Sequence, residues 1–151
     1  MRGNLGRAVV LGGLVAGTID VGAATLISGA SPWLVLRYIA GGLLGRSALK
    51  GGWDIAVLGL GLQWAMSLLI AAIYVLASRR IALLTKAWIA CGLAYGVGIY
   101  GVMNYVVAPL SALHAKTTFT TRSLVLNMAA MLLFGLIVAY FASRQSGTTK
   151  V

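Results

Sequence analysis

The chain has 151 residues and a formal net charge of +10, with 60% hydrophobic and only 9% charged residues. A soluble domain usually carries about a quarter charged residues, so this chain has too few charges to cover a water-facing surface. The composition excludes an ordinary soluble protein and predicts a single transmembrane domain over residues 1–151.

The charged residues stand mostly at the ends of apolar stretches, with twelve Lys and Arg against two acids. This placement suits anchoring at a membrane surface and attraction to anionic lipid head groups. No basic stretch is both long and separate from an apolar run, so we expect the lipid bilayer as the partner and no nucleic acid.

A helix that crosses a bilayer needs about 20 mostly apolar residues. Pro109 is expected to end the third such stretch. The first stretch precedes the Ser-Gly-Ala sequence at 28–30, which fits a signal-peptide cleavage rule. Because this run is long and contains Asp20, we expect it to remain as a span. The four predicted spans are 8–27, 55–77, 87–108 and 123–142.

A fifth apolar stretch, residues 32–44, is too short to span. Ser31 followed by Pro32 is a favourable helix start, and Trp33, Arg37 and Tyr38 are amphipathic. This pattern indicates a helix that lies in the interface or dips into the outer leaflet. The predicted fold class is therefore all-α, an integral membrane four-helix bundle with an additional short interfacial or re-entrant helix between the first two spans.

The distribution of basic residues predicts the orientation, because cytoplasmic loops carry an excess of Lys and Arg. Four spans place both termini on one side of the membrane. The side with the termini has seven bases, namely Arg2, Arg7, Arg79, Arg80, Lys86, Arg144 and Lys150. The other side has five, namely Arg37, Arg46, Lys50, Lys116 and Arg122. The count favours cytoplasmic termini.

Small residues four positions apart let membrane helices approach closely. The first span has Gly13 and Gly17, and the third has Gly92 and Gly96 with Gly98 on another face. We expect a tight bundle with the first and third spans at its centre. Interfacial positions are expected for the aromatic residues Trp33, Tyr38, Trp53, Trp88 and Tyr95.

Four polar residues lie at a similar depth within the spans. Asp20 is the only carboxylic acid or base inside one, and such residues usually face the protein interior. At about 1.5 Å per residue, Gln63, Asn104 and Asn127 fall with it in the outer half of the bilayer. We expect one polar cluster, a hypothetical binding site, with Arg37 of the short helix as an ion-pair partner for Asp20.

Two interpretations of the cluster remain open. In the structural one, Asp20 is neutral or hydrogen-bonded and the amides hold the helices in register, with about 0.5–1.5 kcal/mol from each bond. In the functional one, Asp20 binds a proton or cation, and the amides coordinate that ion or a substrate. Pairing of Asp20 with Arg37 would favour the structural interpretation or a gate.

Enzyme and metal signatures are missing from the sequence. His114 is the only histidine, Cys91 is the only cysteine, and they are far apart in the chain. Ser111 precedes His114 by one helical turn, but no acid is placed to orient the imidazole. We therefore expect no enzyme activity, no metal and no cofactor.

Five segments carry a resemblance to a known group of proteins, namely Gly13–Asp20, Leu26–Pro32, Ile39–Gly45, Tyr95–Val97 and Val102–Ser111. They resemble uncharacterised bacterial four-helix inner-membrane proteins, distantly similar to the YagU-like group. The resemblance covers most of the chain and implies an inner-membrane location but no particular activity. It also implies that histidine often stands at the positions of Gln63 and Asn127, where this chain has amides.

The sequence therefore predicts a non-enzymatic membrane protein with a structural or interaction role and a buried polar cluster. The alternative is a small oligomeric transporter or channel that uses Asp20 as a proton or cation site.

Overall fold

The computed structural model describes residues 2–113 and 120–146, and this part of the chain is helical and contains no strand. Four segments in it are long and apolar enough to cross a membrane, which confirms the predicted all-α fold with four spans. They are α1 (Arg2–Ser28), α3 (Trp53–Arg80), α5 (Trp88–Val102) with its continuation η2 (Met103–Val107) and α6 (Ala108–Leu110), and α7 (Thr121–Ser146). The short elements are α2 (Pro32–Leu44), η1 (Arg46–Lys50) and α4 (Leu83–Lys86).

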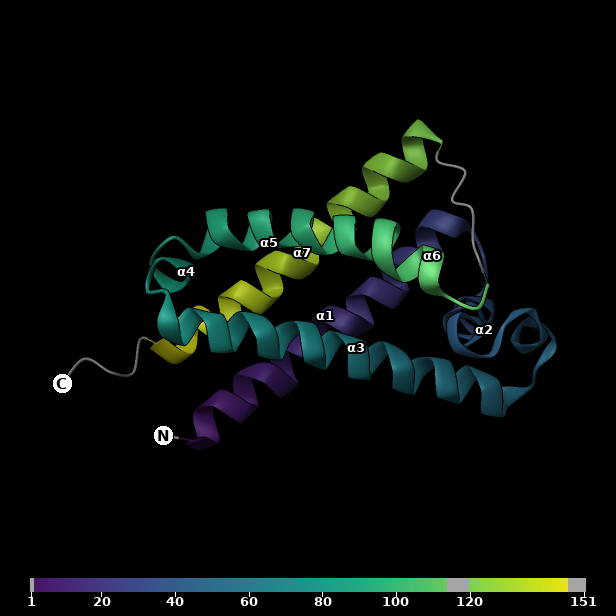
Figure 1. The fold of residues 1–151 in the computed structure, drawn as a ribbon, viewed down its shortest axis with the longest axis horizontal. Helices are drawn as coiled ribbons and strands as arrows, with labels where there is room; N and C mark the ends of the chain where they lie inside the picture. The colour runs from purple at the N-terminus through teal and green to yellow at the C-terminus, as the bar shows by residue number, and fades with distance from the viewer. Residues whose placement is uncertain (1, 114–119, 147–151) are drawn as a thin grey trace.

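The four long helices run alternately up and down the bundle (Figure 1). The start of α1, the end of α7 and α4 lie at one end, which we call the termini end. The short helix α2, η1 and α6 lie at the opposite end, which we call the α2 end. The connection between α3 and α5 is short, so these two helices run in opposite directions.

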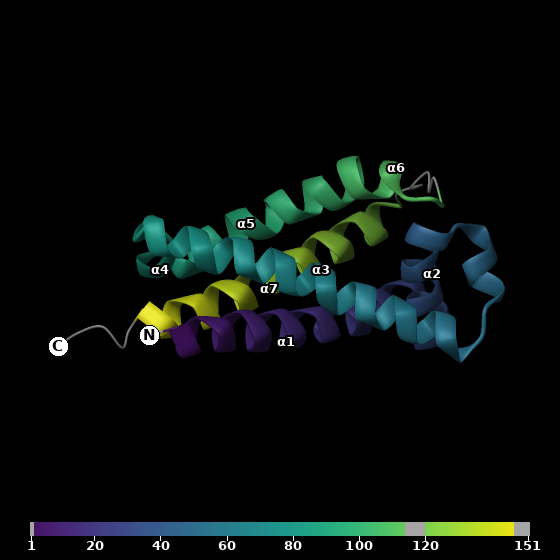
Figure 2. The ribbon, with the colours of Figure 1, turned by 60° about the horizontal axis from the view of Figure 1, so that its bottom comes forward.

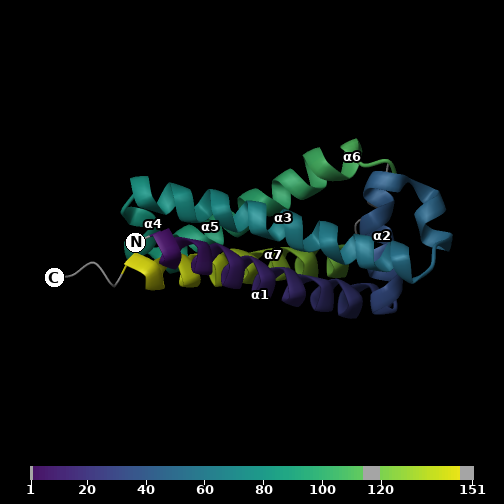
Figure 3. The same ribbon diagram turned by 90° about the horizontal axis from the view of Figure 1, so that it is seen from below.

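The helix α2 has the bounds that the sequence predicted, Pro32–Leu44. The Ser31 Oγ accepts a hydrogen bond from Leu34 N at 3.3 Å, and Pro32 occupies the first turn. Figures 2 and 3 show α2 lying crosswise to the long helices. Its exposed Trp33 ring packs against Trp53 at the start of α3, with centroids 4.0 Å apart. A crosswise helix with exposed aromatic rings is typical of a membrane interface.

The glycine pairs bring helix backbones into close contact, as predicted. On α1, a Cβ at Gly13 would lie 3.0 Å from the Leu68 Cα of α3. On α5, a Cβ at Gly96 would lie 2.8 Å from the Leu132 Cα of α7. Larger side chains at these positions would force the helices apart, so the glycines set the interhelical distances.

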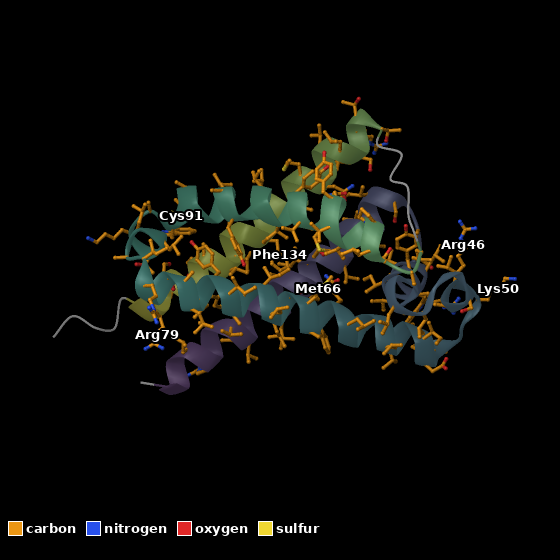
Figure 4. All side chains as sticks on the ribbon, in the orientation of Figure 1. Arg46, Lys50, Met66, Arg79, Cys91 and Phe134 are labelled. Atoms are coloured by element: carbon orange, nitrogen blue, oxygen red, sulfur yellow. The ribbon has the colours of Figure 1, made fainter. Side chains whose placement is uncertain are left out.

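The prediction that the first and third spans are central is wrong for the third span. The helix α7 packs against both α1 and α5, and α1 also packs against α3. The central pair is therefore α1 and α7, with α3 and α5 on the outside. Phe134, Val138 and Ala139 of α7 are buried in the core, and Figure 4 places Phe134 near the middle of the bundle. The physical reason for the close contact with α5 is Gly135, the one glycine of α7, which faces Gly92 and Gly96 of α5.

The third span also continues past Pro109, in contrast to the prediction, and ends at Leu110. Proline lacks an N–H donor, and its ring would clash with the carbonyl four residues before it. The chain adopts a π-helical turn over Met103–Val107, in which Ala108 N donates to Met103 O. Such wider turns relieve that clash and let the helix run on.

Candidate functional site

Asp20 and Gln63 form a direct contact between α1 and α3. The Gln63 Nε2 donates a hydrogen bond to Asp20 Oδ2 at 2.9 Å and lies 3.5 Å from Gly17 O. The short aspartate side chain can reach across because Gly13 and Gly17 bring the two backbones together. Two of the four predicted residues of the polar cluster therefore meet at the predicted shared depth.

A second polar contact lies beside this pair on the same two helices. The Trp64 Nε1 donates to Thr18 Oγ1 at 3.4 Å, and the Thr18 hydroxyl donates to Leu14 O at 2.7 Å. The side chain of Ser67 is buried at the same contact, facing Gly17. Polar groups therefore lie in the contact between α1 and α3, next to the point where the backbones of the two helices come closest.

The other two predicted residues bond within their own helices. The Asn104 Nδ2 donates to Tyr100 O at 2.8 Å. The Asn127 Nδ2 donates to Ser123 O at 2.9 Å and to Ser123 Oγ at 3.1 Å. Both side chains are half-buried, and neither forms a hydrogen bond with Asp20. Asparagine commonly bonds to the carbonyl one turn back, and the sequence alone does not distinguish this partner from one on a neighbouring helix.

Arg37 is not the ion-pair partner of Asp20 within the part of the chain that the structure describes. Its Nε is buried and has no hydrogen-bond partner among residues 2–113 and 120–146. The hydroxyl of Tyr100 is likewise buried without a partner in this part of the chain. Buried polar atoms of this kind are uncommon, because an unmade bond leaves the cost of removing the group from water. The burial of Tyr100 could not be predicted, since a tyrosine in an apolar stretch carries no sequence signal of it.

The carboxylate of Asp20 has one hydrogen-bonded oxygen. Among the described residues, Gln63 is its only hydrogen-bond donor, and no base is paired with it. A membrane-embedded carboxyl with a single amide partner can hold a proton, or it can accept a cation at its other oxygen. The arrangement is therefore chemically compatible with both interpretations of the cluster.

Two tyrosines join α3 to the α4–α5 segment in the other half of the bundle. The Tyr74 hydroxyl donates to Leu84 O at 3.0 Å, and the Tyr95 hydroxyl donates to Ile70 O at 2.7 Å. Their ring centroids are 4.9 Å apart. Tyr95, which was expected at the membrane interface, thus has its hydroxyl bonded to the backbone of a neighbouring helix.

No group of three His, Cys, Asp or Glu side chains gathers anywhere in residues 2–113 and 120–146. Cys91 is half-buried on α5, with its Sγ 3.6 Å from Leu83 O. His114 lies outside the described residues.

No protein-family model matches the chain, and neither a curated protein nor a solved structure matches it. The resemblance to bacterial four-helix inner-membrane proteins stays a prediction. The findings support a helical protein with four helices able to cross a membrane, and within it a polar contact between Asp20 and Gln63.

Proposed function

We propose that the chain is a multi-pass protein of the bacterial inner membrane with a structural or interaction role, and that it is not an enzyme and uses no cofactor. The observation that carries this proposal is the hydrogen bond from Gln63 to Asp20. It links two spans inside the apolar region, where a polar pair fixes the relative rotation and depth of two helices.

The positions of the amides support a structural role over ion coordination. Cation sites gather several oxygen ligands around one point. Asn104 and Asn127 instead donate to carbonyls of their own helices, and Asp20 has a partner on α3 alone among the described residues. In this role the carboxyl is held as a neutral or hydrogen-bonded group between α1 and α3.

The alternative function is a small oligomeric transporter or channel with Asp20 as its proton or cation site. The observation that favours it is the carboxylate oxygen that has no hydrogen bond in the described part of the chain. Intramembrane acids commonly mark proton and ion pathways, because burying a charge there is costly and needs a compensating function.

Two substitutions at one position separate these functions. Asp20→Asn keeps an oxygen that can accept the Gln63 bond but removes the acid, whereas Asp20→Leu removes both. For a structural role, the purified parent protein in vesicles conducts no protons or cations, and Asp20→Asn folds as well as the parent. For a transporter, the parent shows flux, and Asp20→Asn is intact but inactive. Asp54→Asn is the matched control, because Asp54 is the other acid and is exposed.

We also propose that both termini are cytoplasmic. The seven bases on the side of the termini, against five on the other side, support this orientation.

A further inference from the structure

A groove lies between α3 and α5 in the half of the bundle nearest the termini end. The two helices sit on the outside of the central pair, and two tyrosine rings fill part of the space between them. The volume of the groove is about 290 Å³. Its lining residues are Ile73, Tyr74, Ala77, Leu84, Cys91, Ala94 and Tyr95.

The walls of the groove are apolar even though two of its residues carry hydroxyls. The hydroxyl of Tyr74 is bonded to Leu84 O, and that of Tyr95 to Ile70 O, so the rings present mainly carbon to the groove. Small-molecule pockets usually occupy about 300–1,000 Å³, so the groove is just below that range. It suits a slender hydrocarbon chain better than a folded segment.

Positive charge gathers at the end of the molecule where this groove lies. Arg79 and Arg80 end α3, Lys86 ends α4, and all three are exposed. Figure 4 shows Arg79 and Cys91 at the same end of the molecule. The chain has two Asp and Glu residues in all. Asp54 is in the first turn of α3 and Asp20 is in the second half of α1, so both are nearer the α2 end. The three bases are therefore not paired with an Asp or Glu side chain.

We propose that this groove binds one acyl chain of an anionic phospholipid, with the phosphate of its head group held by Arg79, Arg80 and Lys86. The tyrosine rings and the aliphatic residues provide the surface for the chain. The bases provide the preference for an anionic over a zwitterionic head group. This site goes beyond the proposed structural role, and it is at the opposite end of α3 from Asp54.

The experiment uses the full chain in vesicles of phosphatidylcholine that contain a phospholipid with a photoreactive diazirine in its acyl chain. One sample contains a phosphatidylglycerol probe, and the other a phosphatidylcholine probe with the same chains. Mass spectrometry of the cross-linked peptides identifies the modified residues. We expect the phosphatidylglycerol probe to label the groove residues, with Ile73, Ala77 and Ala94 among them, more than the phosphatidylcholine probe does.

Charge variants test the origin of this preference. Each base near a membrane surface strengthens anionic lipid binding about fivefold, so the variant Arg79→Gln/Arg80→Gln/Lys86→Gln should lose the preference. The control is Arg46→Gln/Lys50→Gln, which removes exposed charges at the α2 end and should keep it. For the unchanged protein, added salt should also weaken the labelling by the anionic probe, since exposed charges are screened.

A variant within the groove tests its shape. Cys91→Phe fills the groove and should lower the labelling, whereas Ala90→Phe should not, because Ala90 is exposed on the same helix and does not line the groove. Equal labelling by both probes overturns the proposal. A preference for the anionic probe that survives the triple substitution also overturns it. So does a preference that survives salt at about 1 M, where the Debye screening length is about 3 Å. Anionic labelling that maps outside the groove also overturns it.

Discussion

Gly96 of α5 and Gly135 of α7 face each other so closely that a Cβ on Gly135 would lie 2.8 Å from the Gly96 backbone nitrogen. This contact joins an outer helix to the central pair. Helices in lipid associate through close packing, because lipid chains are as apolar as the side chains that the helices bury. The small residues at this crossing therefore matter more than any large apolar side chain nearby.

Enlarging Gly96 should destabilise the protein. In Gly96→Val, the new side chain meets the backbone of Met131 and Leu132, so α5 and α7 must separate. We expect the free energy of unfolding to decrease by about 1–3 kcal/mol. It is measured on detergent-solubilised protein, to which a denaturing detergent is added stepwise. Gly98→Val is the matched control, because in the described part of the chain a Cβ there would meet no atom of another helix within 4 Å. Equal losses in both variants would show that the contact with α7 is not the cause.

Removing the hydroxyl of Tyr95 should weaken the link between α3 and α5. Tyr95→Phe keeps the ring beside Tyr74 but loses the 2.7 Å hydrogen bond to Ile70 O. We expect a decrease of about 0.5–1.5 kcal/mol in the free energy of unfolding. Tyr105→Phe should have no effect, since the Tyr105 side chain is 79% exposed. An unchanged stability in Tyr95→Phe contradicts the bridging role of this hydroxyl.

Much of the fold could be predicted from the sequence because membrane spans follow from length and hydropathy. The bounds of α2 followed from a local signal, the Ser31 cap before Pro32. The π-helical turn before Pro109 could not be predicted, since a proline signals a disrupted hydrogen bond but not how the chain adapts to it.

The arrangement of the helices and the partners of the polar residues were less predictable. Depth along a span placed Asp20 and Gln63 together correctly, because both lie on the facing surfaces of adjacent helices. Asn104 and Asn127 lie at a similar depth but bond within their own helices. Depth along a span does not determine which face of a helix a residue occupies. The contact of α7 with α5 involves Gly135 and Ala139, four positions apart, and a pair with one glycine is a weaker sequence signal than the glycine pairs of α1 and α5.

Reporter fusions test the proposed orientation. Alkaline phosphatase is active only outside the cytoplasm, so a fusion after Val151 should be inactive. A fusion after Lys50, at the α2 end, should be active in the same cells. An active fusion at Val151 together with an inactive one at Lys50 would reverse the orientation. Equal expression of the two fusions, checked by immunoblotting, is the control.

The central claim is that the bond between Asp20 and Gln63 holds α1 against α3, and a double-mutant cycle tests it most directly. The unfolding free energies of the parent, Asp20→Leu, Gln63→Leu and the double variant give the coupling between the two side chains. We predict a stabilising coupling of about 0.5–1.7 kcal/mol, the range of hydrogen bonds between membrane helices. The same cycle with Asp20 and Asn104 should give no coupling, because Asn104 bonds to its own helix. Additive effects of the Asp20 and Gln63 substitutions, within about 0.3 kcal/mol, would contradict the account.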